Sequence, residues 1–459
     1  MGTINKLLHR RKALSQPLKT PDDFVGSHTK EKKRMTRGSR MQKISVPDYY
    51  PKFNCTGSKC EDTCCSGWWN VSVDYDTYQK YQRNKQPELA PLFKLAISKN
   101  TLPSADKKNN FGMIKMKPDG ECFFLQQDKL CAIHNHMGAQ GLSDTCRLYP
   151  RYLNQFGSQR ENALGISCPE AARLVLLNPQ PMQFIKMAPE PPIDDKPFTS
   201  YRFPLQGEGD PEQIAVLNDF RIVIVAILQF REISLGARVM LLGFLLEDVN
   251  KIAFSEDFAH ASELLPTLES FIGMLSHPAQ LEAQFAQIDP NIPRKLEVVT
   301  KLIEQSLTDR ASERFQECLR AAAEGLAAGK DSATDGAMSG RYKQSYDAFY
   351  RPFFHDKEYI FENYLVNQVI TRLFPFTRGA YLDLYREMVC NLSVIQVLLV
   401  GMAAKHKGLN EELVIQLFQT FARNSNHNRS HLDNLIASLR AEAQDTFVHV
   451  MWMLKETER

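Results

Sequence analysis

Eight of the ten cysteines in this chain of 459 residues lie between positions 55 and 168, close enough in sequence to converge in one small volume. They begin with the pattern C-x4-C-x3-C-C. Thiolates repel one another unless a cation lies between them, and soft sulfur donors select zinc or iron–sulfur clusters over magnesium or calcium. The pattern therefore predicts metal ligation by Cys55, Cys60, Cys64, Cys65, Cys122, Cys131, Cys146 and Cys168.

Two other uses of these cysteines compete with metal ligation. Disulfides would suit an exported protein, but the first residues lack the apolar segment of a secretory signal, and the cytosol reduces ordinary pairs. Buried thiols without a ligand are common singly, which describes Cys318 and Cys390, but eight in one region argue against that reading. A mixed Cys/His zinc site stays open because His134 and His136 follow Cys131 closely.

The number of metal centres and the kind of centre stay open. Four sulfurs suffice for a zinc ion or for a cluster, so eight permit one centre with spare thiols or two centres. Adjacent Cys64 and Cys65 point in divergent directions, so one could ligate while its neighbour completes a second site or packs. Radical S-adenosylmethionine enzymes use C-x3-C-x2-C, and Cys60 and Cys64 begin that signature. Gly67 stands at the third position, so the signature is broken.

Charge is unevenly distributed along the chain. Residues 1–40 hold 11 Lys/Arg and 3 Asp/Glu, a net +8, which leaves 45 against 50, a net −5, for the remainder. We expect residues 1–40 to be a disordered basic arm. Nucleic acid is an unlikely partner, because duplex binders usually present a basic surface and residues 41–459 are acidic. No uncharged apolar segment reaches about 18 residues, so we expect no membrane span and a cytoplasmic protein.

The elements that must position the cysteines divide the chain further. In residues 41–180, Gly and Asn punctuation separates short β-like from helix-like runs, which predicts a small irregular Cys-rich α+β domain carrying metal or iron–sulfur. Residues 181–459 should form a larger helical domain, because apolar residues recur at helical spacing, as over 361–374. We expect a flexible loop near 325–340. The predicted fold class is therefore mainly α.

Several short blocks of the sequence carry a family resemblance: Phe53–Trp68, Gly120–Leu125 with Leu130-Cys131, Leu142–Arg151, Ser167–Glu170 and Glu362–Phe376. Together they resemble the flagellin lysine-N-methylase family. The Cys-rich part is also akin to the broader class of zinc- or iron-chelating CxxCxxCC domains. The resemblance covers everything except the basic arm and is dense over 50–175 and 355–380.

This resemblance implies S-adenosylmethionine-dependent N-methylation of lysine side chains on flagellin in the cytoplasm, with an iron–sulfur cluster (4Fe-4S) on the cysteines. Zinc is the alternative to the cluster. A lysine amine, with a pKa of about 10.4 in water, must lose its proton before it attacks a methyl group, and a dry pocket with a nearby acceptor helps it to do so. The candidate catalytic residues are Glu362 and Tyr364. The candidate cofactor-binding residues are Trp68, Arg147, Tyr149, Arg151 and Asn363.

One feature of the common methyltransferases is missing from the sequence. Their glycine-rich turn follows an apolar strand and opens a helix. The nearest glycine pair, Gly207-x-Gly209, has no apolar strand before it. The methyl donor would then bind in an unusual helical fold. The alternative function is that of a non-catalytic zinc- or iron-binding protein that binds a protein partner.

Overall fold

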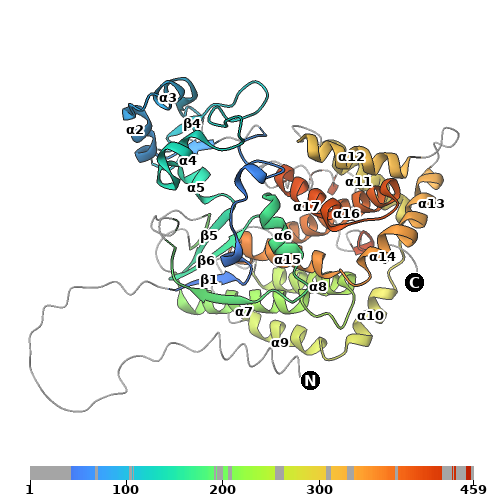
Figure 1. Ribbon diagram of the computed structural model, residues 1–459. Coiled ribbons are helices and arrows are strands. Elements are labelled where there is room, and N and C mark those ends of the chain that lie inside the picture. Colours follow the sequence, from blue (N-terminus) through green and yellow to red (C-terminus); the bar gives the residue numbers. More distant parts are fainter. Residues whose placement is uncertain are drawn as a thin grey trace, which may run out of the picture.

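The computed structural model shows a small lobe beside a larger helical body, and the two meet at a mixed sheet (Figure 1). The basic arm predicted for residues 1–40 and the candidate residue Trp68 lie outside the part that the structure describes. The described residues are 43–67, 71–102, 106, 108–190, 193, 200–204, 209–253, 263–306, 312–327, 335–377, 381–425, 437, 439–440 and 451–455.

The small lobe, here called the Cys-rich lobe, consists of the described residues from 65 to 148. Its sheet is antiparallel, with strand order β2-β4-β3, and its core includes the stacked rings of Tyr81 and Phe93, whose centroids are 4.3 Å apart. Asp74 caps the first helix by accepting a hydrogen bond from the Thr77 N–H (3.0 Å). The lobe's elements are β2 (Val71–Val73), α2 (Tyr75–Arg83), α3 (Ala90–Ala96), β3 (Ile97–Lys99), β4 (Gly112–Ile114), α4 (Ala132–Met137), η4 (Ala139–Gly141) and α5 (Asp144–Leu148).

A five-stranded sheet with order β7-β1-β6-β5-β8 lies between the lobe and the body. The pairs β1–β6 and β5–β8 are parallel, and the other neighbours are antiparallel. Two of its strands follow residue 181, so the predicted domain boundary near 180 falls between strands of one sheet. The strands are β1 (Ile44–Pro47), β5 (Arg151–Phe156), β6 (Gln159–Leu164), β7 (Phe184–Met187) and β8 (Tyr201–Phe203).

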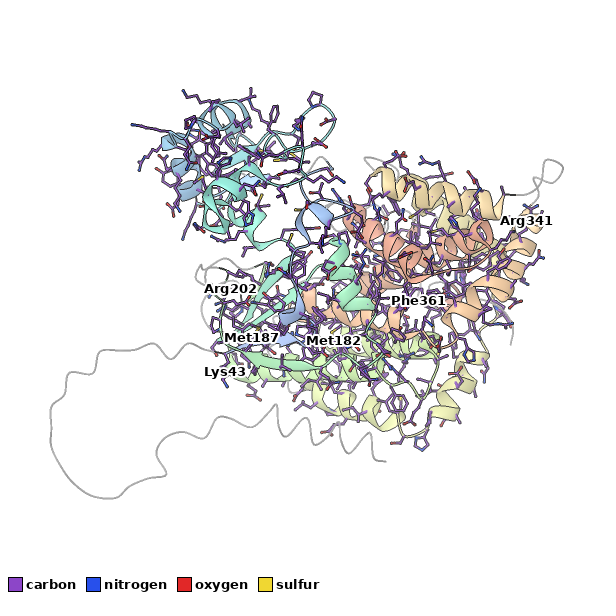
Figure 2. The ribbon with its side chains drawn as sticks, in the orientation of Figure 1. Lys43, Met182, Met187, Arg202, Arg341 and Phe361 are labelled. Atoms are coloured by element: carbon purple, nitrogen blue, oxygen red, sulfur yellow. The ribbon has the colours of Figure 1, made fainter. Side chains whose placement is uncertain are left out.

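The helical body, defined here as the helices α6 to α17, confirms the prediction of a mainly α fold with a larger helical part. One continuous core runs through it, and Phe361 lies inside it while Arg341 lies at its far end (Figure 2). Its helices are α6 (Pro169–Leu176), α7 (Pro211–Leu228), α8 (Leu235–Ala253), α9 (Leu264–Met274), α10 (Pro278–Ala286), α11 (Ile292–Ser306), α12 (Glu313–Leu326), α13 (Asp335–Ser345), the π-helix η6 (Tyr346–Tyr350), α14 (Arg351–Phe354), α15 (Tyr359–Thr371), α16 (Tyr381–His406) and α17 (Glu411–Ser425).

Two glycines allow α12 and α16 to pack closely. A Cβ atom on Gly325 would lie 1.9 Å from the Gly401 carbonyl oxygen, and one on Gly401 would lie 2.6 Å from the Ala322 carbonyl oxygen. The backbones touch there, so a larger residue at either position would force the helices apart. The loop predicted near 325–340 covers fewer residues than expected, because α12 continues to Leu326 and α13 begins at Asp335.

The helix α16 is long and apolar enough to cross a membrane by length and composition alone. However, 89% of its most apolar window is buried inside the protein, as in the central helix of a folded core. Among the described residues, no other helix passes the same test.

Candidate functional site: two groups of thiols

Four of the predicted ligands gather in the core of the Cys-rich lobe. Cys122 is buried there, and Cys65, Cys131 and Cys146 pack against the same core. The Cys122 N–H donates to the Cys65 carbonyl oxygen (2.7 Å), which fixes these two residues side by side. We call Cys65, Cys122, Cys131 and Cys146 the lobe thiols.

Short elements bring the remaining lobe thiols to the same place. Cys131 precedes α4 and forms an isolated β-bridge with Leu125, whose N–H donates to the Cys122 carbonyl oxygen (3.0 Å). Cys146 lies on α5, and the neighbouring Thr145 hydroxyl lies 3.2 Å from the Ser72 hydroxyl of β2. Loops alone would leave these thiols free to separate, and these backbone and side-chain bonds hold them together.

The other four predicted ligands lie where the lobe meets the helical body. Cys168 is the N-cap residue of α6 and packs against the large core of the body. Cys60 follows the short 3₁₀ helix η3 (Gly57–Lys59), which begins at Gly57 with a left-handed φ of 58°. Cys55 and Cys64 are exposed on the same loop. We call Cys55, Cys60, Cys64 and Cys168 the junction thiols.

Two side chains of α17 fasten this loop to the body. The Gln419 side-chain N–H₂ donates to an Asp62 carboxylate oxygen (2.8 Å) and to the Ser167 carbonyl oxygen (2.9 Å). Arg423 forms an ion pair with Asp62 and donates to the Thr63 carbonyl oxygen (3.3 Å). Gln419 therefore places the segment between Cys60 and Cys64 beside the residue that precedes Cys168. Neither Gln419 nor Arg423 follows from the sequence, in which the only signal of this contact is the acid Asp62 inside the cysteine pattern.

The thiols of each group influence one another's protonation. Burial, and then the neighbouring Cys60 and Cys55, raise the pKa of Cys168 to about 11. In the lobe, burial followed by Cys65 and Cys131 raises the pKa of Cys122 to about 12. Most of these thiols would therefore stay protonated at neutral pH, and a metal would have to displace their protons on binding.

The adjacent pair at the boundary of the two groups behaves differently. The Cys64 thiol hydrogen-bonds Cys65, which raises the pKa of Cys64 and lowers that of Cys65 to about 7. Cys64 also lies within electrostatic reach of both Cys146 and Cys55, one from each group. The two groups are thus neighbours that meet at this dipeptide.

All ten cysteines are described, and all are free, so the structure holds no disulfide among them. Within the described residues, no three His, Cys, Asp or Glu side chains lie close enough to hold a single metal ion. A zinc ion draws four sulfurs to about 2.3 Å from itself, whereas a cluster places its own irons and sulfides between the protein sulfurs. The donor chemistry fits a thiolate-bound centre, with the sulfurs spaced more widely than one ion requires. His134 and His136 are exposed on α4.

Two of the candidate cofactor-binding residues lie beside the junction thiols. The Tyr149 hydroxyl is 3.2 Å from the Ser167 hydroxyl, and burial followed by the charge of Cys168 raises the pKa of Tyr149 well above its usual value. The Arg151 guanidinium lies over the Phe53 ring, 5.0 Å from its centroid. The third described residue of this block, Arg147, forms an ion pair with Asp144 one turn earlier on α5.

The block Glu362–Tyr364 lies in α15, buried inside the helical body. The Glu362 carboxylate has no exposed surface and accepts hydrogen bonds at 2.8 Å from Arg231 and from Arg238. Asn363 donates to the carbonyl oxygens of Leu176 (3.2 Å) and Asn178 (2.9 Å).

Tyr364, the third residue of this block, packs edge-on against Phe418 of α17, with ring centroids 5.3 Å apart. Burial raises its pKa well above the ordinary value. The three residues of the block thus connect α15 to α6, to α8 and to α17. The hydrogen bonds of Glu362 and Asn363 described above join them to arginines and to backbone carbonyls and not to the thiols.

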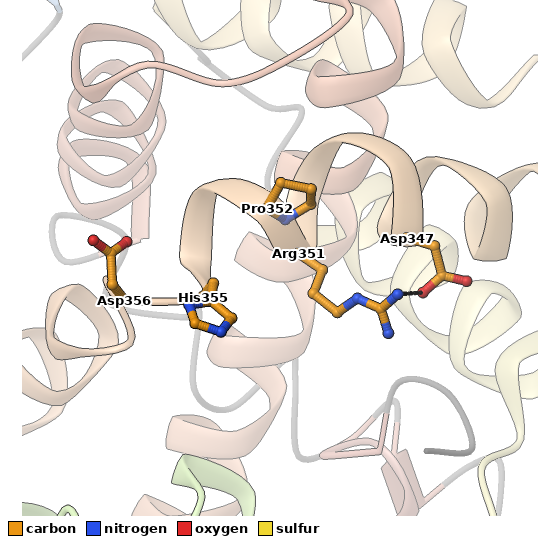
Figure 3. A pocket seen from close by; sticks show the side chains of 5 residues that line it. All are labelled: Asp347, Arg351, Pro352, His355 and Asp356. Atoms are coloured by element: carbon orange, nitrogen blue, oxygen red, sulfur yellow. Dashed lines mark ion pairs between the residues drawn. The ribbon is translucent and has the colours of Figure 1, made fainter.

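The aromatic cluster around η6 is mainly packing. Tyr342, Tyr350 and Phe354 are buried, and the rings of Tyr350 and Phe354 lie 4.6 Å apart. An open pocket of about 500 Å³ lies on the outer side of this segment, where Asp347 and Arg351 form an ion pair at 3.2 Å (Figure 3). The pocket is lined by Asp347, Arg351, Pro352, His355 and Asp356.

A short strand precedes the glycine pair noted in the sequence, but it is not a buried apolar strand of the kind that opens the common methyltransferase turn. β8 precedes Gly209, and α7 begins two residues later with Asp210 as its N-cap, which accepts from the Glu212 N–H (3.0 Å). β8 lies at the edge of the sheet, and only its last residue, Phe203, is buried. Gly207 lies outside the described residues.

Comparisons with known proteins relate the chain to a family and to three named proteins. Residues 221–453, about half of the chain, match the family described as the FliB lysine N-methylase C-terminal domain. The flagellar biosynthetic protein FliU of Salmonella muenchen is 32% identical over 145 residues, which cover 31% of this chain and 83% of that protein. Lysine-N-methylases of Salmonella typhimurium and Salmonella choleraesuis are 32% identical over 146 residues, 31% of this chain and 35% of each relative. No solved structure matches the chain.

Proposed function

The chain belongs to the FliB lysine N-methylase family, a family of protein-lysine methyltransferases, and on that premise we propose that it methylates lysine side chains of flagellin with S-adenosylmethionine as the donor. The match of residues 221–453 to the lysine N-methylase domain carries this proposal. The alignment covers only 35% of each named lysine-N-methylase. The methyl donor and the protein substrate of this chain are therefore our proposals and are not inferred from the relatives' names alone. A flagellar name among the relatives supports flagellin as the protein substrate.

The transfer requires a neutral lysine amine in line with the donor methyl group. Glu362 and Tyr364 remain our candidate catalytic residues, and their contacts separate their roles. Two arginines already occupy the Glu362 carboxylate, which favours a role in positioning α15. Tyr364 is a neutral phenol held on the same helix, so a proton passed to or from a substrate amine would involve its hydroxyl.

For the donor we propose a place near the junction between lobe and body. Tyr149 and Arg151 lie there, and Trp68 follows directly on the cysteine loop in the sequence. A sulfonium cation favours aromatic faces, and Tyr149 supplies one beside the junction thiols. Arg147 and Asn363 are proposed as supports of this place, because the first is bound to Asp144 and the second fixes the end of α6.

We also propose an iron–sulfur cluster of the 4Fe-4S type, with zinc as the alternative, on the cysteines of the two groups. Such a centre would supply a rigid cross-link among the loops or a site for electron transfer. The free state of all ten cysteines supports a reducing compartment, and we propose the cytoplasm. A membrane or a nucleic acid is not part of the proposal.

The decisive experiment incubates the full chain, purified without oxygen, with flagellin and S-adenosylmethionine and reads the intact mass of flagellin. We expect one or more increments, each the mass of a methylene group, located on lysines by peptide sequencing. Matched reactions omit the donor or use flagellin with acetylated lysines, and both should give no increment. Binding of flagellin without any increment would support the alternative, a metal-carrying protein that binds a partner without methyl transfer.

A further inference from the structure

We infer that the Arg151 guanidinium binds the α-carboxylate of the methyl donor and thereby selects donors that carry this group. The inference rests on the proposed function, because it places the amino-acid end of S-adenosylmethionine at the junction between lobe and body. It goes further by naming the part of the donor that this arginine recognises and the kind of molecule that the arginine rejects.

The first reason is that the charge of Arg151 is not neutralised where those of its neighbours are. At the same junction, Arg173 forms an ion pair with Glu61, and Arg423 forms one with Asp62. Arg151 makes neither an ion pair nor a side-chain hydrogen bond with any residue that the structure describes. One positive charge at the junction is therefore available to an acidic group from outside the described chain.

The second reason is a buried donor atom on the same side chain. The Nε atom of Arg151 is enclosed by the protein, yet no oxygen within the described part of the chain accepts its hydrogen. A buried N–H without an acceptor costs free energy, and a ligand oxygen can recover it. The two terminal nitrogens are not enclosed in this way, so a ligand can approach the guanidinium from its outer end.

The third reason is that Arg151 is held in place without a ligand. Its guanidinium carbon lies over the Phe53 ring, 5.0 Å from the centroid. Its backbone pairs with Leu164 of β6, and the preceding Pro150 carbonyl oxygen accepts from the Gly165 N–H (2.8 Å). An arginine fixed in this way loses little freedom on binding, and its planar fork can donate two hydrogen bonds to one carboxylate.

The neighbourhood of Arg151 favours the carboxylate of the donor over one from a protein. Only Pro150 separates Arg151 from Tyr149, the residue proposed to offer its aromatic ring to the sulfonium. In S-adenosylmethionine three carbon atoms join the sulfur to the carboxylate carbon, so one small molecule carries both groups close together. The sulfonium and the ammonium of this molecule are cations, and its carboxylate is the only negative group. A cationic arginine therefore attracts the donor at that group alone.

The test measures the binding of two donors to the full chain, purified without oxygen, by isothermal titration calorimetry. One is S-adenosylmethionine, and the other is its decarboxylated form, which keeps the adenosine, the sulfonium and the amine. We expect the unaltered chain to bind S-adenosylmethionine about 10- to 100-fold more tightly, the range that hydrogen bonds between charged groups contribute. Arg151→Met keeps an apolar stem over Phe53 and removes the charge. It should bind both forms as weakly as the unaltered chain binds the decarboxylated form.

Two further variants separate the carboxylate contact from a general effect of charge. Arg151→Lys keeps the charge without the planar fork, so it should retain only part of the preference for S-adenosylmethionine. Arg173→Met is the matched control, because Arg173 is a junction arginine that already pairs with Glu61 and Glu170, and it should keep the full preference. Thermal unfolding checks that each variant is folded. If Arg151→Met does not fold, Arg151→Lys and the preference of the unaltered chain decide.

Equal affinity of the unaltered chain for the two forms would overturn the inference, and so would an undiminished preference in Arg151→Met. The proposed function would stand in both cases, because the donor still binds. Absence of binding of either form to the unaltered chain would overturn the proposed donor site and the inference with it. An unchanged donor affinity in Arg151→Met, together with a raised KM for flagellin, would assign Arg151 to an acidic group of the protein substrate and would overturn the inference as well.

Discussion

The Cys-rich lobe and the helical body solve the problem of stability in different ways. Among the described residues, the lobe's core contains twelve buried hydrophobic side chains, and its strands have three residues each. The body has one continuous core built from helices of up to 26 residues. Small units with small cores usually need disulfides or metal to remain folded. The lobe has free thiols and no disulfide, whereas the body has the burial that makes such links unnecessary.

The two regions also differ in how their buried polar groups are neutralised. In the body, buried charges are paired within the protein, as Glu362 is with Arg231 and Arg238 and as Glu161 is with Arg221 (2.8 Å). In the lobe and at the junction, the gathered groups are thiols that lie within electrostatic reach of one another. Burial, followed by the neighbouring cysteines, raises the pKa of Cys122 and Cys168, and a bound cation would oppose this effect. The buried charges of the body are neutralised by other side chains of the protein. The thiols of the lobe are the donors of a site that would be neutralised by a bound metal.

Metal removal should therefore separate the two regions most strongly. We expect chelation of the reconstituted protein, or the variant Cys122→Ser with Cys146→Ser, to abolish protection from hydrogen exchange over residues 71–148. Protection in α15 and α16 should change little, because these helices belong to the large core, to which only Cys168 of the eight clustered thiols contributes. Hydrogen exchange with mass spectrometry measures both regions in one experiment. Equal loss of protection in lobe and body would contradict the comparison.

The reverse experiment weakens the body and leaves the lobe's metal in place. Glu362→Gln removes the charge that neutralises Arg231 and Arg238, and breaking a buried pair in this way costs about 3–5 kcal/mol. We expect a lower melting temperature with unchanged metal content. Glu358→Gln is the matched control, because Glu358 is half exposed and pairs with Arg238 at 3.2 Å, a kind of contact worth about 0–1 kcal/mol. Loss of activity by Glu362→Gln without any loss of stability would instead favour a direct catalytic role.

The sequence predicted the chemistry of the lobe better than its geometry. The cysteine spacing identified the ligand candidates and the helical period identified the body, because both signals are local. The division of the thiols could not be predicted, since it depends on which core each one contacts. Glu362 shows the same limit of sequence-based prediction. Its position in a recognisable block suggested a catalytic role, but its two arginine partners are more than 120 residues away in the sequence, and only the fold brings them together.

A smaller effect is expected where the two regions are fastened together. Gln419→Ala removes hydrogen bonds to Asp62 and to the Ser167 carbonyl, and such bonds to a charged group contribute about 1–3 kcal/mol. We expect faster proteolysis of the loop over residues 55–66 and faster loss of any metal held by the junction thiols. Gln416→Ala is the matched control on the same helix, since Gln416 contacts Arg314 and Glu317 of the body. Identical proteolysis of the two variants would argue against the fastening role.

The smallest change tests whether the junction also serves the donor. Tyr149→Phe removes only the hydroxyl that contacts Ser167, so we expect a loss of stability of about 1 kcal/mol and no loss of metal. If the donor binds on the aromatic face of Tyr149, Tyr149→Leu should raise its KM while kcat stays close to the unaltered value, because the face is lost and the reacting groups are untouched. Tyr152→Leu, at a neighbouring position on β5 whose ring stacks on Tyr201 instead, should leave KM unchanged. An unchanged KM in Tyr149→Leu would restrict the junction to a structural link and would move the search for the donor to the helical body.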